Sequence, residues 1–119
     1  MDVKRFINSP VSSNTYILQF EKNNDCVIID PGSKKSEELI DYLKLNQLKP
    51  KYVFFTHFHF DHVWGIEELL KYYKPIIICS KDCFSRLSKP ENYFNLLYYN
   101  SSDFLLPGSI ITQSLFFSN

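Results

Sequence analysis

Three histidines and one aspartate lie within a six-residue window, and they are the residues of this chain best suited to chemistry. The window contains His57, His59, Asp61 and His62, and it holds every histidine of the 119-residue chain. The aromatic and β-branched run at residues 52–56 predicts a buried strand that ends where the histidines begin. In an extended segment residues i and i+2 project to one side, so His57 and His59 can bind one divalent ion. The turn that follows presents Asp61 and His62 elsewhere, where they suit a second ion.

The ligand types indicate which metal this window would bind. Imidazole and carboxylate together favour zinc, and iron and manganese remain alternatives. Apolar residues at helical spacing over residues 63–73 predict a helix whose positive N-terminal end favours an ionised Asp61. The bland alternative is a histidine cluster that packs in a loop or binds metal adventitiously. A cluster this dense at a strand-to-helix junction favours the metal site, because packing does not require it.

At these residues the sequence resembles the metallo-β-lactamase superfamily. The family signature Thr-His-x-His-x-Asp-His-x-x-Gly is matched by Thr56, His57, His59, Asp61, His62 and Gly65. Residues 13–17 resemble the family's early Asn-x-Tyr strand, and residues 27–32 resemble its strand that ends in an Asp-x-Gly turn. The resemblance extends from about residue 10 to about residue 85 and is more specific for the family than for a substrate.

The resemblance implies an α/β fold of two βα halves packed as an αββα sandwich, of which this chain resembles the first half. In the family, the second half supplies a third histidine to the first metal, a bridging aspartate, and a last histidine to the second metal. This chain has no histidine after His62, and Asp82 and Asp103 do not stand in a matching context. We therefore expect residues 1–119 to form one incomplete domain, truncated or split. The apolar tail at 109–119 is either a last strand or an unrelated end.

The function implied by the resemblance is metal-dependent hydrolysis. One or two zinc ions would lower the pKa of a bound water from about 9 toward about 7, and the hydroxide would attack a carbonyl. Asp61 would orient this nucleophile or accept its proton. Within the family, His59 argues against the diiron oxygen-reducing branch and His62 against the β-lactamase branches. The remaining group is hydroxyacylglutathione-hydrolase-like, so we expect a small acyl thioester as substrate, with lactones and phosphoesters open.

A second hypothesis differs in class. The chain would then be a truncated or split half-domain that binds metal weakly and is catalytically inactive alone. The missing second-half histidines favour this hypothesis, since two complete metal shells in the family need more histidines than the chain has. Apolar strands such as 27–29, 53–55 and 76–78 are typical of a sheet covered on both faces. A half-domain would expose one of these faces, so we expect a homodimer or a missing second-half chain as partner.

Asp30 has two interpretations. In the segment Asp30-Pro31-Gly32, a turn must end the strand, because Pro31 lacks an N–H and Gly32 can take a positive φ. Asp30 is then a turn former. The family resemblance instead implies that Asp30 braces the metal loop without binding metal.

Composition excludes several classes of partner. The formal net charge is zero and no dense run of basic residues occurs, which argues against nucleic-acid binding. The N-terminus lacks the apolar region of a secretory signal, and no apolar run reaches membrane-spanning length. We expect a cytoplasmic protein without a membrane partner. Its three cysteines, Cys26, Cys79 and Cys83, fit reduced core thiols better than disulfides or a metal pair.

The remaining elements follow from periodicity and turn signals. Residues 2–7, 14–21 and 26–30 read as strands, of which the last two form a hairpin. Ser36 is predicted to cap a helix that packs Leu39, Ile40 and Leu43, and strand, helix and strand then form a βαβ step. Residues 76–79 read as a buried strand, and the segment Ser80-Lys81-Asp82 as the cap of another helix. Tyr93, Phe94, Leu97 and Tyr98 recur at helical spacing, which is typical of a core helix.

Overall fold

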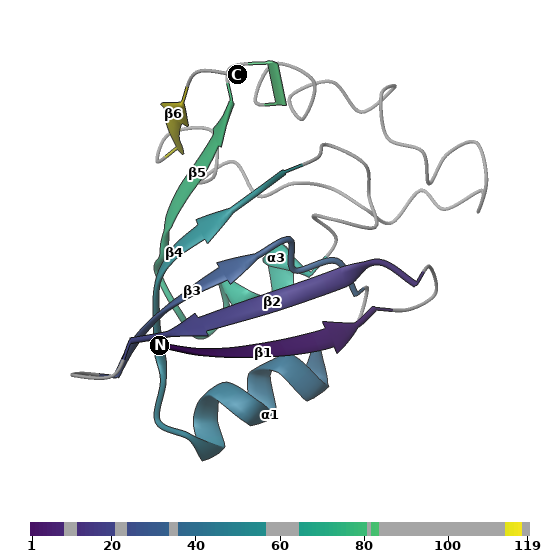
Figure 1. The fold of residues 1–119 in the computed structure, drawn as a ribbon, viewed down its shortest axis with the longest axis vertical. Helices are drawn as coiled ribbons and strands as arrows, with labels where there is room; N and C mark the ends of the chain where they lie inside the picture. The colour runs from purple at the N-terminus through teal and green to yellow at the C-terminus, as the bar shows by residue number, and fades with distance from the viewer. Residues whose placement is uncertain are drawn as a thin grey trace.

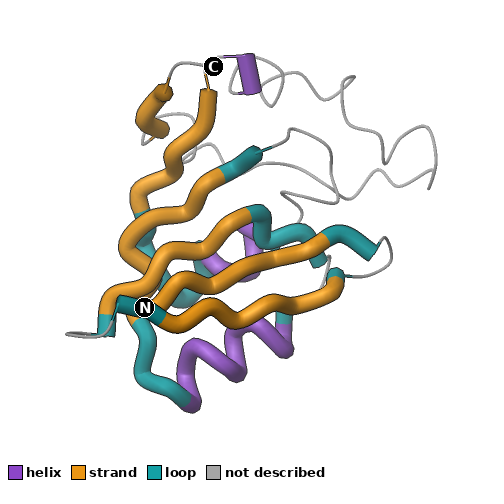
Figure 2. The backbone as a smooth tube through the Cα atoms, viewed as in Figure 1, coloured by secondary structure: helices purple, strands orange, loops and turns teal. Residues whose placement is uncertain are grey.

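The computed structural model describes residues 1–8, 12–20, 24–33, 36–56, 65–80, 82–83 and the backbone of 114–117. These residues form one twisted sheet, whose strands lie in chain order (Figure 1, Figure 2). The strands are β1 (Asp2–Ile7), β2 (Asn14–Gln19), β3 (Asp25–Ile29), β4 (Lys49–Phe54), β5 (Ile76–Ser80) and β6 (Ser114–Phe117). The helices are α1 (Glu37–Leu45) and α3 (Ile66–Leu69). Within these ranges no helix is long and apolar enough to cross a membrane.

The sheet has an antiparallel part followed by a parallel part. β1, β2 and β3 pair antiparallel, whereas β3, β4, β5 and β6 pair parallel. The predicted hairpin of β2 and β3 is therefore confirmed, and so is the βαβ step formed by β3, α1 and β4. Because β1 also runs parallel to β3, the carboxyl ends of β1, β3, β4 and β5 meet at one edge of the sheet. The motif segment that follows β4 starts from this edge.

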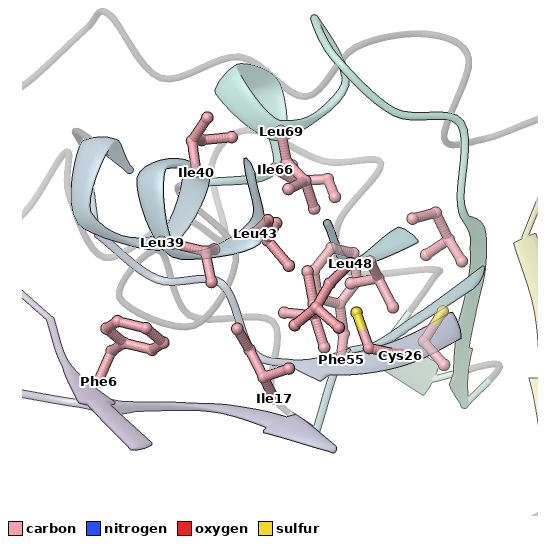
Figure 3. Close-up of a cluster of buried hydrophobic side chains, with 14 of the residues drawn as sticks. Phe6, Ile17, Cys26, Leu39, Ile40, Leu43, Leu48, Phe55, Ile66 and Leu69 are labelled. Atoms are coloured by element: carbon pink, nitrogen blue, oxygen red, sulfur yellow. The ribbon is translucent and has the colours of Figure 1, made fainter. Parts of the chain in front are cut away.

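Both described helices cover the same face of the sheet (Figure 3). A row of neighbouring residues across four strands faces them, and it consists of Ile17, Ile28, Val53 and Ile77. From the helices, Leu43, Ile66 and Leu69 are fully buried against this row. The predicted apolar faces of both helices are thus confirmed, and their burial fixes the helices on the sheet.

The opposite face of the sheet carries exposed apolar side chains. Successive strand residues point to opposite faces, so Val3 and Ile7 point away from the helices, since Phe6 between them contacts Tyr42 of α1. Val3 is 59% exposed and Ile7 is 62% exposed. Ile76, the neighbour of buried Ile77, is 38% exposed. Of the strands for which an exposed apolar face was predicted, β5 shows one at Ile76, whereas Val27 of β3, which also points away from the helices, is only 7% exposed.

β4 begins and ends earlier than the sequence pattern predicts. It starts at Lys49 and includes Pro50, which pairs with Cys26 of β3. A proline fits here because β5 pairs with β4 only from Tyr52 onward, so no neighbour on that side needs a donor from Pro50. The predicted last residue of the strand, Thr56, lies outside β4, because its N–H donates to the Asp30 carboxylate instead of to the sheet.

The helix predicted over residues 63–73 is described only from Gly65 onward, and there it ends earlier than predicted. α3 ends at Leu69, since the N–H groups of Lys71 and Tyr72 bond to carbonyls three residues back rather than four. The last turn is therefore tightened, as helix ends commonly are. The Ser80 hydroxyl accepts the Cys83 N–H at 3.1 Å, which is the kind of hydrogen bond expected of the predicted cap, while the helix expected after it lies largely outside the described residues.

Residues 114–117 form β6, so the apolar tail does contribute a strand. The core helix predicted around Tyr93 and Tyr98 lies outside the described residues. The start of the helix predicted over residues 63–73, at Val63, also lies outside them.

Candidate metal centre

The four predicted metal ligands lie together in segment 57–64, which is outside the described residues. They are His57, His59, Asp61 and His62. The structure describes what holds this segment at each end. Phe55 and Thr56 precede it and Gly65 follows it, and all three contact neighbouring elements.

The entry to the segment is held by the carboxylate of Asp30. Thr56 donates its backbone N–H to Oδ1 of Asp30 at 2.7 Å, and its hydroxyl donates to Oδ2. One residue earlier, the Phe55 N–H bonds to the Ile78 carbonyl of β5 at 3.0 Å, so Phe55 still belongs to the sheet. Asp30 is only 5% exposed, and both of its carboxylate oxygens accept hydrogen bonds from Thr56. The carboxylate therefore sets the direction in which the chain leaves the sheet, directly before His57.

The backbone of Asp30 also turns the chain. Asp30 has a φ of 53°, in the left-handed region that aspartate tolerates better than most residues. Gly32, which could have taken a positive φ in this turn, does not do so, because no described glycine has a positive φ. The Thr15 hydroxyl lies 2.6 Å from the Asp30 carbonyl oxygen and holds this conformation from β2. Asp30 is thus both a turn former and the partner of Thr56.

The exit from the segment is held by the residue next to Asp30. The Gly65 N–H donates to the Pro31 carbonyl at 2.7 Å, and the Gly65 carbonyl accepts the Ser36 hydroxyl at 3.4 Å. A Cβ on residue 65 would lie 2.9 Å from the Pro31 oxygen and 3.0 Å from the Ser33 oxygen. Real Cβ atoms rarely come this close to other atoms. The motif glycine is therefore required for close packing, since its φ of −80° is open to any residue.

Ser36 has a different role from the predicted helix cap. It occupies the N-cap position of α1, yet its side chain makes no cap hydrogen bond. Its hydroxyl instead contacts the carbonyls of Ser33 at 3.3 Å and Gly65 at 3.4 Å. The predicted N-cap position is therefore confirmed, but the cap hydrogen bond is not made, because the close approach of Gly65 offers this buried hydroxyl a tertiary partner. α1 therefore helps to hold the motif segment as well as packing on the sheet.

A buried polar network supports the loop that makes these contacts. The Asn8 amide oxygen lies 2.9 Å from the hydroxyls of both Thr15 and Ser33, and its amide nitrogen donates to the Ser13 hydroxyl at 2.9 Å. These bonds tie the loop between β3 and α1 to the turn between β1 and β2. No sequence pattern singles out Asn8, Ser33 or Thr15 as supporting residues. The only signal for one of them was that Thr15 lies inside the family-like run 13–17.

A pocket of about 80 Å³ lies beside this network, lined by Asn8, Thr15, Ser33 and Glu38 among others. Polar residues of this network and Glu38 of α1 therefore share one cavity.

The residues present fit a metal centre at segment 57–64. The eight-residue segment is held at both ends by consecutive residues, Asp30 and Pro31, so its span is fixed. Three imidazoles and a carboxylate within such a segment form a donor set that zinc accepts. In the described part of the chain, no other group of three histidine, cysteine or acidic side chains is placed to hold a metal ion.

Comparison with known proteins gives one family. The sequence profile of the Metallo-beta-lactamase superfamily matches residues 8–99. The hydroxyacylglutathione hydrolase of Blochmanniella pennsylvanica is 32% identical over 101 residues, which are 84% of this chain and 38% of that protein. The hydroxyacylglutathione hydrolase of Pectobacterium carotovorum is 43% identical over 68 residues, which are 56% of this chain and 26% of that protein.

Solved structures agree on the fold. The crystal structure of the BLEG-1 B3 metallo-beta-lactamase matches with a TM-score of 0.76 and 25% identity, over 90% of this chain and 54% of that one. The chain spans less than half the length of the two hydroxyacylglutathione hydrolases. It therefore matches only part of their fold, as expected of a first half.

Proposed function

Because the chain belongs to the metallo-beta-lactamase superfamily, we propose that it provides the metal-binding half of a zinc-dependent hydrolase. The proposed ligands are His57, His59, Asp61 and His62. The observation that carries this proposal is that the carboxylate of Asp30 and the carbonyl of Pro31 hold the two ends of segment 57–64. Metal ligands need such support, because coordination tolerates only small errors in position.

The donor set fits one or two zinc ions, with iron or manganese as alternatives. When bound, zinc supplies Lewis acidity, which polarises a carbonyl oxygen and brings the pKa of a coordinated water toward about 7. Among the chain's own groups, the Asp61 carboxylate would orient the attacking water or accept its proton. Asp30 is a positioning residue, because both of its carboxylate oxygens accept hydrogen bonds from Thr56.

A small acyl thioester is the proposed substrate class. Hydroxyacylglutathione hydrolases are among the relatives, one of which shares 32% identity over 84% of this chain. The zero net charge and the lack of a dense basic run give no support to a nucleic-acid substrate. The three cysteines are free and buried, which fits the reducing cytoplasm as the proposed location.

The second candidate function is a half-domain that binds metal but is inactive alone, and a specific count favours it. All three histidines of the chain are already assigned to segment 57–64, whereas the family is expected to use five. The chain also corresponds to only 38% of its Blochmanniella relative. We therefore propose that turnover requires further ligands from outside residues 1–119, whether from a second-half segment, a second chain or a second copy.

The sheet offers a surface for that partner. Val3, Ile7 and Ile76 are exposed on the face that the helices leave uncovered. Exposed apolar groups of this kind favour association, since burying them removes them from water. A homodimer and a separate second-half chain are both compatible with this surface.

Metal content tests the first part of the proposal. The chain, purified without a histidine tag, is compared with the double variant His57→Ala, His59→Ala. We expect bound zinc or iron in the wild type and much less in the double variant. A matched control replaces Glu67 and Glu68 of α3 by alanine, which removes two metal-capable side chains just outside the motif and should leave metal content unchanged. Equal metal content in the wild type and the histidine variant would refute the proposal.

A thioester assay with added zinc tests the second part. The chain alone should show no metal-dependent turnover, whereas a mixture with the part of the Blochmanniella enzyme that this chain does not match should hydrolyse the thioester. Turnover by the isolated monomer would show that the ligand count is wrong. A zinc-loaded mixture with no turnover would favour the inactive half-domain.

A further inference from the structure

Two buried thiols lie together at the carboxyl end of β5, the sheet edge from which the motif segment starts. Cys79 is 1% exposed and Cys83 is 5% exposed, and both are free. The turn between them is held by the bond from the Cys83 N–H to the Ser80 hydroxyl. The two buried thiols lie four residues apart on either side of this turn, and a hydrogen bond between them shifts the pKa of each.

The two thiols are not equivalent in reactivity. The hydrogen bond from Cys83 lowers the pKa of Cys79 below its ordinary value, against the opposing effect of burial. Donating that bond raises the pKa of Cys83, and burial and the nearby carboxylates of Asp30 and Asp82 raise it further. Because the thiolate is the nucleophile in thiol oxidation, we expect Cys79 to react first and Cys83 to resolve the oxidised sulfur.

Cys26 provides an internal comparison. It is a third free thiol, fully buried in β3, and burial followed by the charge of Asp25 raises its pKa to about 12. No hydrogen bond from a second thiol lowers this value. Cys26 should therefore stay reduced under conditions that oxidise the pair.

We propose that Cys79 and Cys83 form a reversible intramolecular disulfide on reaction with hydrogen peroxide. The Cys79 thiolate attacks one peroxide oxygen, the O–O bond breaks, and Cys79 becomes a sulfenic acid as hydroxide leaves. The Cys83 sulfur then attacks the Cys79 sulfur, the S–O bond breaks, and water leaves. Overall, two thiols and one peroxide give one disulfide and two waters, so two electrons pass from sulfur to peroxide.

The burial of the pair favours peroxide over a larger oxidant. Peroxide is close to water in size, whereas a glutathione disulfide would have to bring its sulfur to a thiol that is 1% exposed. The inference does not depend on the proposed hydrolase function, since it uses no metal and no residue of segment 57–64. Its failure and the failure of the hydrolase proposal are therefore separate results.

Peptide mapping of the intact chain tests the proposal without any substitution. Reduced, desalted protein is treated with peroxide, unfolded, alkylated and cut with trypsin. Trypsin cuts after Lys81, so the disulfide joins the peptides 72–81 and 82–86, whereas Cys26 lies on a separate peptide. We expect the joined pair, about 2 Da lighter than the sum of the two reduced peptides, with Cys26 alkylated and the pair restored by a thiol reductant.

Variants sharpen the result. Cys26→Ser should form the same linked peptides, and Cys83→Ser should leave Cys79 as an alkylation-resistant sulfenic or sulfinic acid. The proposal is wrong if peroxide leaves all three thiols free, if it oxidises Cys26 as readily as Cys79, or if the disulfide links two chains.

Discussion

Replacing Asp30 by alanine removes the side chain that holds the start of the motif segment. Its carboxylate accepts the Thr56 N–H at 2.7 Å and also the Thr56 hydroxyl. Each hydrogen bond to a charged group contributes about 1.5–3 kcal/mol. Because Thr56 is exposed and water can replace part of the lost bonding, the lower value applies to each bond, which gives about 3 kcal/mol. Alanine at a φ of 53° adds about 1 kcal/mol, so the expected loss is about 4 kcal/mol.

Urea denaturation measures this loss. With an m-value of about 1.5 kcal/mol/M, a loss of about 4 kcal/mol lowers the unfolding midpoint by between about 2 and 3 M. Asp30→Asn is the matched control, since asparagine keeps the volume, tolerates the positive φ and can still accept the Thr56 N–H. We expect it to lose only about 1–2 kcal/mol, and it provides a folded variant even if the alanine variant unfolds.

Zinc affinity then separates the two roles of Asp30. If Asp30 braces the metal loop, Asp30→Asn should weaken zinc binding by roughly 10- to 100-fold in competition with a chelator, as loss of a supporting residue typically does. If Asp30 is only a turn former, the variant should bind zinc like the wild type. Unchanged zinc affinity in a folded Asp30→Asn chain would therefore refute the bracing role, and unchanged stability of Asp30→Ala would refute the energetic argument.

The remaining predictions concern the other end of the segment, the chemistry, the exposed face and the thiol pair. Gly65→Ala should lower the free energy of unfolding by about 1–3 kcal/mol, because its Cβ would press on the Ser36 hydroxyl and on two carbonyls. Adding Ser36→Ala removes that hydroxyl, so it should recover part of this loss in urea denaturation. In a thioester-hydrolysing complex, Asp61→Ala should lower kcat far more than it raises KM, and full activity in steady-state kinetics would contradict the proton-accepting role. Ile7→Lys should reduce self-association in light scattering, since Ile7 is 62% exposed on the uncovered face, whereas Leu45→Lys on α1, at 84% exposure, should leave it unchanged. The rate of disulfide formation should rise with pH and level off below the ordinary thiol pKa, because the pKa of Cys79 is lowered, and a rate that keeps rising through that value would count against Cys79 as the attacking thiol.

Local pattern was enough to predict most of the sheet. The hairpin of β2 and β3 and the βαβ step follow from alternation, turn residues and helical spacing, which act between neighbours in the chain. The cluster of His57, His59, Asp61 and His62 is likewise visible in the sequence because its members lie within one window. Their roles as ligands stay a prediction, since segment 57–64 lies outside the described residues.

The supporting contacts were decided by tertiary structure. Thr56 turns away from the sheet because a carboxylate 26 residues earlier accepts its N–H. The Ser36 side chain makes no cap hydrogen bond, because Gly65, 29 residues later, approaches its hydroxyl. The positive φ falls on Asp30 rather than Gly32, since Thr15 in β2 and Thr56 just after β4 both bond to Asp30. Each of these choices is a competition between a local partner and a distant one, and a sequence pattern shows only the local partner.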